Sequence, residues 1–277
     1  MSLDVFAIIL LGAALHATWN AVVKGGDDKL LTTCMIASFA SLIALAVIPF
    51  LAVPAKASWP FIGASVMLQV VYFVLVAATY RLADMSQTYP IMRGTAPLLV
   101  ATASAGLLSE SLSSFAWLGI GVICIGILSM AAAPSTGQRK GMLLALLNAA
   151  IIAGYTLIDG IGVRKSGAPA AYTVWIFLLT GLPLAAWAFT VRRRAFCRYL
   201  ARHWRPGVIG GFGTVASYGL ALWAMTAAPI ATVAALRETS ILFGVVISAL
   251  VLKEQLTRTR ILAACIIAAG AMVLRLG

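Results

Sequence analysis

Long apolar stretches separated by short polar breaks run through the whole chain. A membrane-spanning helix needs roughly 20 apolar residues, whereas a barrel strand needs about 9–11 residues of alternating polarity. Turn-forming residues such as Gly25 and Gly26, or Pro134 and Gly137, close the stretches. The pattern therefore predicts an all-α integral membrane protein with ten transmembrane helices, over 3–23, 30–53, 60–81, 85–107, 112–133, 141–163, 170–191, 206–227, 229–252 and 256–275.

The composition supports this fold class. Hydrophobic residues make up 62% of the chain and charged residues 10%, against about 45–50% and 25% in soluble domains. These values exclude a soluble globular enzyme, a disordered chain and a disulfide scaffold. The cysteines form no C-x-x-C pair, so we expect buried free thiols at Cys34, Cys124, Cys197 and Cys265. We interpret the first stretch as a retained helix and not as a signal peptide.

The basic residues are distributed unevenly between the loops. The chain has 20 Lys and Arg against 8 Asp and Glu, which we attribute to membrane topology and not to nucleic-acid binding. Fourteen basic residues fall in the odd-numbered loops and four in the even-numbered loops and termini. The positive-inside rule then places the odd loops in the cytoplasm and both termini outside. The loop at 192–205, with six arginines among Phe196, Tyr199 and Trp204, is expected to form a short amphipathic helix on the membrane surface.

The two halves of the chain carry a matching pattern. Arg93 stands seventeen residues before Glu110, Arg237 stands seventeen residues before Glu254, and the offset between the pairs is 144 residues. The pattern predicts two five-helix repeats, residues 1–134 and 141–277. Because each repeat has an odd number of spans, the second is inverted relative to the first. Inverted repeats are typical of secondary transporters, whose substrate site lies near the midplane.

The repeated loop carries a family resemblance. A Glu at the loop tip is followed by a polar residue and Leu, and then by a glycine-rich helix, with Pro97 thirteen residues before Glu110. This pattern resembles the EamA family of the drug/metabolite transporter superfamily. The resemblance implies ten helices in two inverted repeats, alternating access around a central cavity, and both termini inside, in conflict with the charge count. The second half departs from the pattern, with Ile241 at the position of Pro97.

Two arginines lie inside predicted spans. Arg93 and Arg237 each stand eight residues into a stretch, roughly 12 Å deep, and inverted repeats bring them to the midplane from opposite faces. Two guanidinium groups beside one cavity can bind a carboxylate, phosphate or phosphonate. Alternatively, each arginine pairs with a carboxylate and ties helices together.

The candidate carboxylates within spans are Asp159 and Glu238. If they are free, the cavity offers both signs of charge and suits a zwitterion. Either can also act as a proton-coupling group. Asp159 can instead extend to the membrane surface near Arg164 and Lys165.

Polar residues of the first stretch share one helical face. His16, Trp19 and Asn20 are spaced by three and four residues, so this face should point into the bundle. We predict a solute-binding role for Trp19 and Asn20, and hydrogen bonding or proton transfer for His16. Tyr89 and Tyr155 are further candidates for substrate binding. Other aromatics, Tyr72, Trp175, Tyr218 and Trp223, can line the path or simply pack.

Further features have structural interpretations. Pro90 and Pro97 predict a kink or hinge beside Arg93. Glu110 and Glu254 are expected to stabilise a helix N-terminus. Small residues in the fifth and tenth stretches predict packing or homodimer contacts, at Gly119, Gly121, Gly126, Ala263, Ala264, Ala268, Ala269 and Gly270.

No nucleotide-binding loop or metal motif occurs, so we expect no cofactor and no catalytic residue. The predicted function is secondary active transport of a small anionic or zwitterionic solute, of the amino acid or aminophosphonate class, across the inner cell membrane. The expected partners are this solute and the lipid bilayer. One alternative is proton-coupled efflux of hydrophobic cations through Asp159 and Glu238. Another is an integral membrane enzyme that acts on lipid headgroups.

Overall fold

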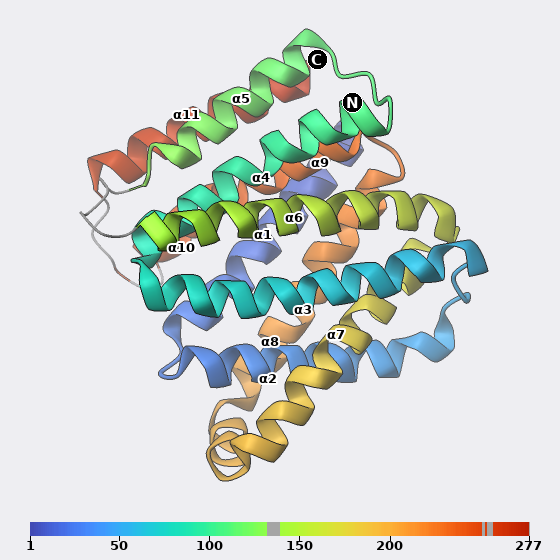
Figure 1. Ribbon diagram of the computed structural model, residues 1–277, viewed down its shortest axis with the longest axis vertical. Helices are drawn as coiled ribbons and strands as arrows, with labels where there is room; N and C mark the ends of the chain where they lie inside the picture. The colour runs from blue at the N-terminus through green and yellow to red at the C-terminus, as the bar shows by residue number, and fades with distance from the viewer. Residues whose placement is uncertain (132–138, 251–252, 254–256, 277) are drawn as a thin grey trace.

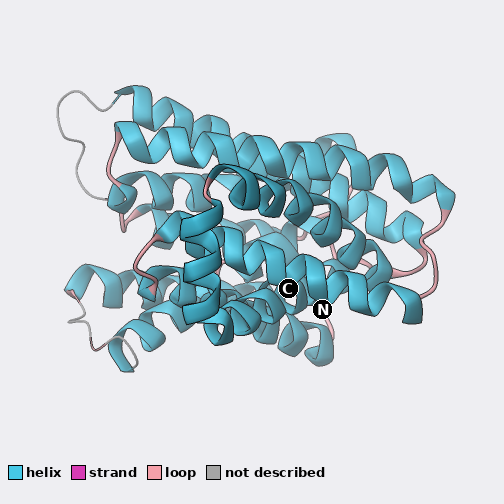
Figure 2. Cartoon of the chain, turned by 90° about the horizontal axis from the view of Figure 1, so that it is seen from below, coloured by secondary structure: helices cyan, strands magenta, loops and turns pink. Residues whose placement is uncertain are grey.

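Helices form every long element of the protein. The computed structural model describes residues 1–131, 139–250, 253 and 257–276, and within these ranges it has no strand (Figure 2). The α-helices are α1 Leu3–Gly25, α2 Lys29–Val47, α3 Trp59–Leu82, α4 Met85–Leu107, α5 Ser114–Leu128, α6 Arg139–Ser166, α7 Pro169–Val191, α8 Arg193–Met225, α9 Ile230–Arg237, α10 Ser240–Leu250 and α11 Arg258–Leu276, with two short 3-10 turns, Ile48–Phe50 and Lys56–Ser58.

Polar side chains cap the N-termini of several helices. The Ser2 hydroxyl accepts the Val5 N–H at the start of α1, and the Asp28 carboxylate accepts the Leu31 N–H at the start of α2. Such caps satisfy backbone donors that have no partner inside the helix. The polar breaks between the apolar stretches therefore end one helix and begin the next.

Most of these helices can cross a bilayer. Eight apolar spans of 19 to 33 residues occur in the described part of the chain, one of them composed of α9 and α10 together. The shorter apolar helix α5 and the polar-containing α4 are the other two predicted segments. An all-helical, multi-pass membrane protein is confirmed, and the count of ten spans stays a prediction.

The helices lie roughly side by side, with the loops at two ends of the bundle (Figure 1). Both termini lie at the same end (Figure 1). Helices α5 and α11 form one pair at an edge, α1 packs against α8, and α3 packs against α6. Helices α4 and α9 meet in the interior, which brings the segment containing Arg93 to the segment containing Arg237.

A break interrupts one predicted stretch in the second half of the chain, and the kink expected in α4 stays a prediction. Helix α4 runs continuously from Met85 to Leu107 with Pro90 and Pro97 inside it. The stretch expected as one helix over 229–252 is instead two helices, α9 and α10, with Glu238 and Thr239 between them. Helix α4 continues through its two prolines. The equivalent stretch, which has no proline inside α9 or α10, breaks directly after Arg237.

Two further expectations change in the structure. Helix α8 begins at Arg193, thirteen residues before the predicted start at 206, because the arginine-rich segment is itself helical. Three of the small residues, Gly119, Gly126 and Gly270, lie where α5 and α11 touch within the chain. A Cβ atom at Gly119 would lie 2.9 Å from the Gly270 carbonyl oxygen, so these glycines allow two helices to touch. A homodimer stays a prediction.

The cysteines divide into two kinds. Cys34 and Cys124 are buried, as expected, whereas Cys197 and Cys265 are exposed. The expectation of a buried thiol was wrong for these two because Cys197 lies on the arginine-rich segment and Cys265 on the outer face of α11.

Candidate functional site

An ion pair joins α4 to the break between α9 and α10. The Arg93 Nη2 atom lies 2.9 Å from the Glu238 Oε1 atom, and the two side chains are only 10% and 7% exposed. Glu238 follows the last residue of α9, so its side chain leaves the broken helix and reaches α4. For Arg93, this pair matches the alternative interpretation, in which an arginine pairs with a carboxylate and ties helices together. Arg237 is not part of the pair.

The neighbouring Arg237 has a different environment. Its guanidinium carbon lies 4.8 Å from the centre of the Tyr218 ring on α8, a cation–π contact. Within the described ranges, no carboxylate oxygen lies within salt-bridge distance of Arg237. Arg237 is partly buried and is the last residue of α9. It is therefore a cation inside the bundle that is held by an aromatic face and not neutralised by direct contact.

Asp159 lies on the other side of the same tyrosine. The Tyr218 hydroxyl donates to its Oδ2 atom at 2.5 Å, and the Tyr172 hydroxyl donates to its Oδ1 atom at 3.1 Å. The carboxylate is completely buried, with a further hydrogen bond from Ser65 of α3. Asp159 therefore does not extend to the membrane surface. Donors from three helices hold it inside the protein.

These groups form one cluster, which we call the central cluster: Arg93, Arg237, Asp159, Glu238, Tyr155, Tyr218 and His16. The charges of both arginines act on the side chains of Tyr155, His16 and Glu238. The two arginines lie near one another, because Glu238 pairs with Arg93 and adjoins Arg237 in the chain. Four tyrosines from α3, α4 and α6 lie close enough to Arg93 to interact with its charge: Tyr72, Tyr80, Tyr89 and Tyr155.

The polar face of α1 contributes mainly His16. The Trp19 Nε1 donates to the His16 Nδ1 atom at 3.3 Å, and the two rings meet edge to face. The Asn20 side-chain amide donates to the His16 carbonyl oxygen one turn earlier. Trp19 also packs against α8 near Gly213. Asn20 and Trp19 thus have local partners, while the charges of both arginines act on His16.

The central cluster has unused hydrogen-bonding capacity. The Arg93 Nε atom and the Glu238 Oε2 atom are buried and have no hydrogen-bond partner among the described residues. A buried donor or acceptor without a partner costs about 1–3 kcal/mol. With both carboxylates ionised, the four charged side chains sum to zero, so the cluster offers a donor, an acceptor and both signs of charge to a polar ligand.

Two shallow pockets lie at opposite ends of the bundle, outside the central cluster. One, of about 430 Å³, is lined by residues 80–85, between α3 and α4. The other, of about 420 Å³, is lined by residues 109–111, Arg164 and residues 226–229. The central cluster is a packed polar centre between these two ends.

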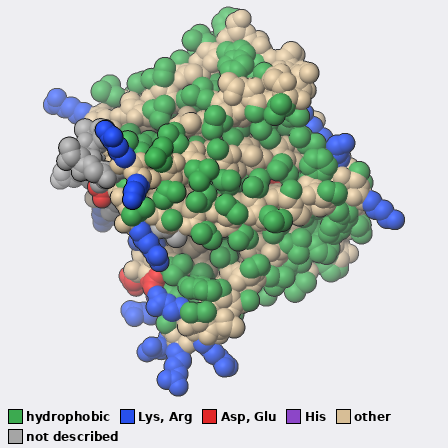
Figure 3. All heavy atoms as spheres, viewed as in Figure 1, with side chains coloured by type: hydrophobic (Ala, Val, Ile, Leu, Met, Phe, Trp, Pro, Cys, Tyr) green, Lys and Arg blue, Asp and Glu red, His purple; other side chains and the backbone are tan. Residues whose placement is uncertain are grey.

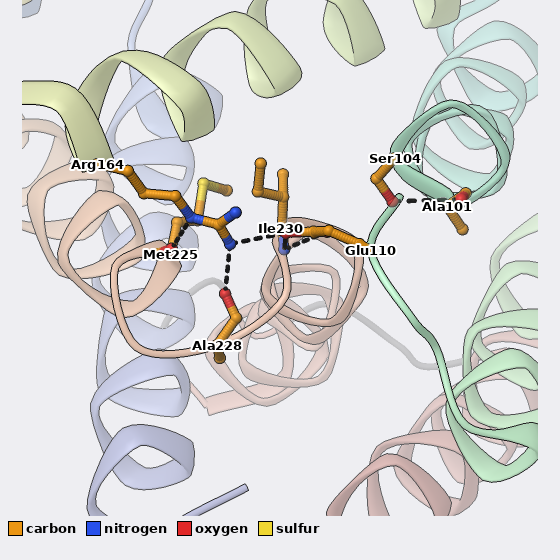
Figure 4. Close-up of polar contacts among 7 residues, drawn as sticks. All are labelled: Ala101, Ser104, Glu110, Arg164, Met225, Ala228 and Ile230. Atoms are coloured by element: carbon orange, nitrogen blue, oxygen red, sulfur yellow. Dashed lines mark hydrogen bonds and ion pairs between the residues drawn. The ribbon is translucent and has the colours of Figure 1, made fainter. Parts of the chain in front are cut away.

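The second pocket surrounds a polar contact between the halves of the chain (Figure 4). The Glu110 carboxylate accepts the Ile230 N–H at 3.0 Å and lies 2.7 Å from the Arg164 guanidinium, which donates to the Met225 and Ala228 carbonyl oxygens. Glu110 thus accepts a backbone N–H at a helix N-terminus, but that of α9. Its own helix α5 is capped by Ser113. Glu254 lies outside the described residues.

The pattern of the sequence revealed part of this cluster. It indicated the charged residues, because a charge inside an apolar stretch is conspicuous. Tyr172 and Ser65 were missed, and Tyr218 was noted only as an aromatic that could line the path. No spacing connects these residues with Asp159, since each comes from a different helix and only the tertiary packing brings them together.

Comparison with known proteins supports a transporter. Residues 139–276 match the EamA-like transporter family. No curated protein matches the chain. A solved structure described only as "Crystal structure of protein" is similar over 98% of both chains, with a TM-score of 0.73 and 16% sequence identity. At that identity the likeness concerns the fold alone. The family match points to a transporter and not to an enzyme. The chain belongs to the EamA-like transporter family of the drug/metabolite transporter superfamily. Together with the apolar helices, this makes it a multi-pass membrane transporter.

Proposed function

We propose that this protein is a secondary active transporter of a small anionic or zwitterionic organic solute, of the amino acid or aminophosphonate class. It works by alternating access in the inner cell membrane. Ten spans form two inverted five-helix repeats, residues 1–134 and 141–277, and the solute binds at the central cluster between them.

Backbone geometry supports the repeat. Ser109 and Lys253 both have φ of 53°, and among the described residues they are the non-glycine positions with positive φ. They are 144 residues apart, the same offset that separates Arg93 from Arg237. A non-glycine residue adopts this conformation uncommonly. Its recurrence at equivalent loop positions favours two copies of one structural unit.

The environment of Arg237 is the main support for the proposal. An arginine inside a membrane-spanning segment is expensive and usually pairs with a carboxylate or faces a polar pathway. Arg237 has a tyrosine ring beneath it and no carboxylate in contact within the described ranges. Its planar donor groups suit a carboxylate, phosphate or phosphonate. In this proposal Arg237 binds the acidic group of the solute.

Glu238 and Arg93 supply the remaining contacts. The unpaired Oε2 atom of Glu238 can accept a hydrogen bond from an ammonium group, and the unpaired Nε atom of Arg93 can donate to a second acidic oxygen. Tyr89, Tyr155, Trp19 and Asn20 provide the surrounding surface. A zwitterion would therefore place its acid on Arg237 and its amine on Glu238.

Asp159 is the proposed proton-coupling group. Protonation of Asp159 would change the four-charge sum of the central cluster from zero to +1. An anion at Arg237 would restore neutrality, so proton binding and anion binding favour each other. Tyr218 contacts both Asp159 and Arg237, so it connects the proposed proton site with the proposed anion site. His16 and Glu238 are weaker candidates, since the charges of two arginines act on His16 and Glu238 is paired with Arg93.

Transport of hydrophobic cations is less well supported. It would require Asp159 or Glu238 to be free for a cation, yet Asp159 accepts two tyrosine hydroxyls and Glu238 is bound to Arg93. Arg237 lies near these two carboxylates, and its positive charge would repel a cationic solute.

Ligand-induced stabilisation of the purified protein tests the solute class. A ligand that binds only the folded state raises the unfolding temperature. We expect stabilisation by amino acids or aminophosphonates and none by hydrophobic quaternary ammonium compounds. Stabilisation by the cations alone would contradict the proposal. Arg258→Ala, an exposed arginine at the start of α11, is the control for Arg237→Ala, which should lose the effect.

A further inference from the structure

Helix α8 is longer than the bilayer is thick, so its arginine-rich start lies outside the hydrocarbon core. Helix α8 has 33 residues, about 50 Å at 1.5 Å per residue, whereas the hydrocarbon core is about 30 Å thick. The backbone leaves helical geometry at His203, with φ of −120° and ψ of 23°. Residues 193–202 therefore form a separate segment at the end of the bundle, at the lower edge of Figure 1. We call it the basic arm.

The apolar side of the basic arm is already used within the protein. Phe196 is fully buried in a cluster with Leu31 and Met35 of α2, and its ring meets Phe189 edge to face. The Tyr199 hydroxyl lies 2.7 Å from the Thr32 hydroxyl. These contacts fix the basic arm against α2 and α7. It is not free to insert an apolar face into lipid, which corrects the expected amphipathic surface helix.

The opposite side of the basic arm presents exposed cations. Six arginines within and beside it are exposed, and within the described ranges none of them forms an ion pair: Arg192, Arg193, Arg194, Arg198, Arg202 and Arg205. Figure 3 shows basic side chains gathered at the lower left, where the arm projects. Acidic residues nearby are occupied, since Asp27 pairs with His203 and Asp28 caps α2.

We propose that the basic arm binds anionic phospholipid headgroups of the adjacent leaflet. The arm directly precedes a membrane-spanning helix, which places it at headgroup depth. Its guanidinium groups match phosphate oxygens in charge and geometry. Trp204, 51% exposed at the junction, has the amphipathic ring that is enriched at membrane interfaces. Arg194, Arg198 and Arg202 follow at four-residue spacing, so they form one row on the helix.

Lipid-dependent stabilisation of the full chain tests this proposal. Phosphatidylglycerol added to the purified protein should raise its unfolding temperature by about 2–4 °C, and phosphatidylcholine should not. The triple variant R194Q/R198Q/R202Q should lose this shift. The control K56Q/K165Q/R275Q removes the same charge at the opposite end of the bundle and should keep it. Equal loss in both variants, equal shifts with both lipids, or the same shift with inorganic phosphate would overturn the proposal.

A second measurement keeps the arm intact. A fluorophore on Cys197, which is exposed within the basic arm, would report nearby lipid in a Cys265→Ser background. Quenching should be stronger with headgroup-labelled phosphatidylglycerol than with headgroup-labelled phosphatidylcholine at equal mole fraction, and high salt should remove the difference. Equal quenching by the two lipids would overturn the proposal independently of any variant's folding.

Discussion

The guanidinium of Arg237 lies over the ring of Tyr218, and the hydroxyl of the same tyrosine donates to Asp159. One side chain thus connects a cation and an anion from two different helices without letting them touch. The cation keeps its hydrogen-bond donors available, and the anion stays buried. This arrangement distinguishes Arg237 from Arg93, whose positive charge is neutralised directly by Glu238.

Substitutions of Tyr218 separate its two contacts. Tyr218→Phe keeps the ring beneath Arg237, so solute affinity should change little. Tyr218→Leu removes the cation–π contact, worth about 1–2 kcal/mol when desolvated, and should weaken binding by about 5- to 30-fold. Solute titrations of the two variants, followed by intrinsic fluorescence or calorimetry, measure the difference. Equal affinities in Phe and Leu variants would show that the ring does not support Arg237.

Asp159→Asn mimics a permanently protonated carboxyl group. In the wild type, acidification should strengthen anion binding, because a proton on Asp159 leaves the central cluster with a net charge of +1. The variant should bind the solute at every pH as the wild type does in acid, and its transport should no longer respond to a proton gradient. Solute uptake into proteoliposomes at several pH values checks this. A wild-type pH profile in the variant would exclude Asp159 as the coupling group.

The Arg93–Glu238 pair should matter for stability as a unit. Removing one member leaves the other buried and unpaired, which typically costs about 3–5 kcal/mol. We expect Glu238→Gln and Arg93→Met each to destabilise the protein, and the double variant to be less destabilised than the sum of the two singles. Unfolding in mild detergent measures this coupling. Additive effects would indicate that the ion pair contributes no mutual stabilisation.

Glu110 should stabilise the start of α9 from across the molecule. Glu110→Ala removes the acceptor of the Ile230 N–H, and loss of a helix cap costs about 1 kcal/mol. The neighbouring Ser111→Ala is the control, since Ser111 is exposed. Hydrogen exchange of the α9 amides should accelerate in the Glu110 variant alone. Unchanged exchange at α9 would assign Glu110 a purely local role in its loop.

Orientation in the membrane can be measured with the native thiols. Cys34 and Cys124 are buried, Cys265 lies in the middle of a spanning helix, and Cys197 is exposed at the end that carries most basic residues. The charge count predicts that an impermeant thiol reagent labels Cys197 only from the cytoplasmic side. Labelling only from outside would favour the opposite topology, which the family resemblance implies.

Much of the fold could be predicted from the apolar stretches, because spanning helices need long runs of one residue class. The break at Glu238 could not, since no proline stands beside it and the side chain leaves its helix to reach Arg93 on α4. The basic arm was also missed as part of α8, because its apolar contacts with α2 involve residues such as Phe196 and Met35 that lie far apart in sequence. The tyrosine partners of Asp159 come from separate helices for the same reason.

Solute transport by the Arg237→Ala variant tests the central claim most directly. The wild type, Arg237→Ala and the Arg258→Ala control would be reconstituted in proteoliposomes, and uptake of a labelled solute identified by thermal stabilisation would be followed against time. A lost charge-assisted hydrogen-bond pair of about 1.5–3 kcal/mol weakens binding by about 10- to 100-fold. We predict uptake close to background for Arg237→Ala, with folding retained and Arg258→Ala unaffected. Wild-type uptake by a folded Arg237→Ala protein would contradict the account.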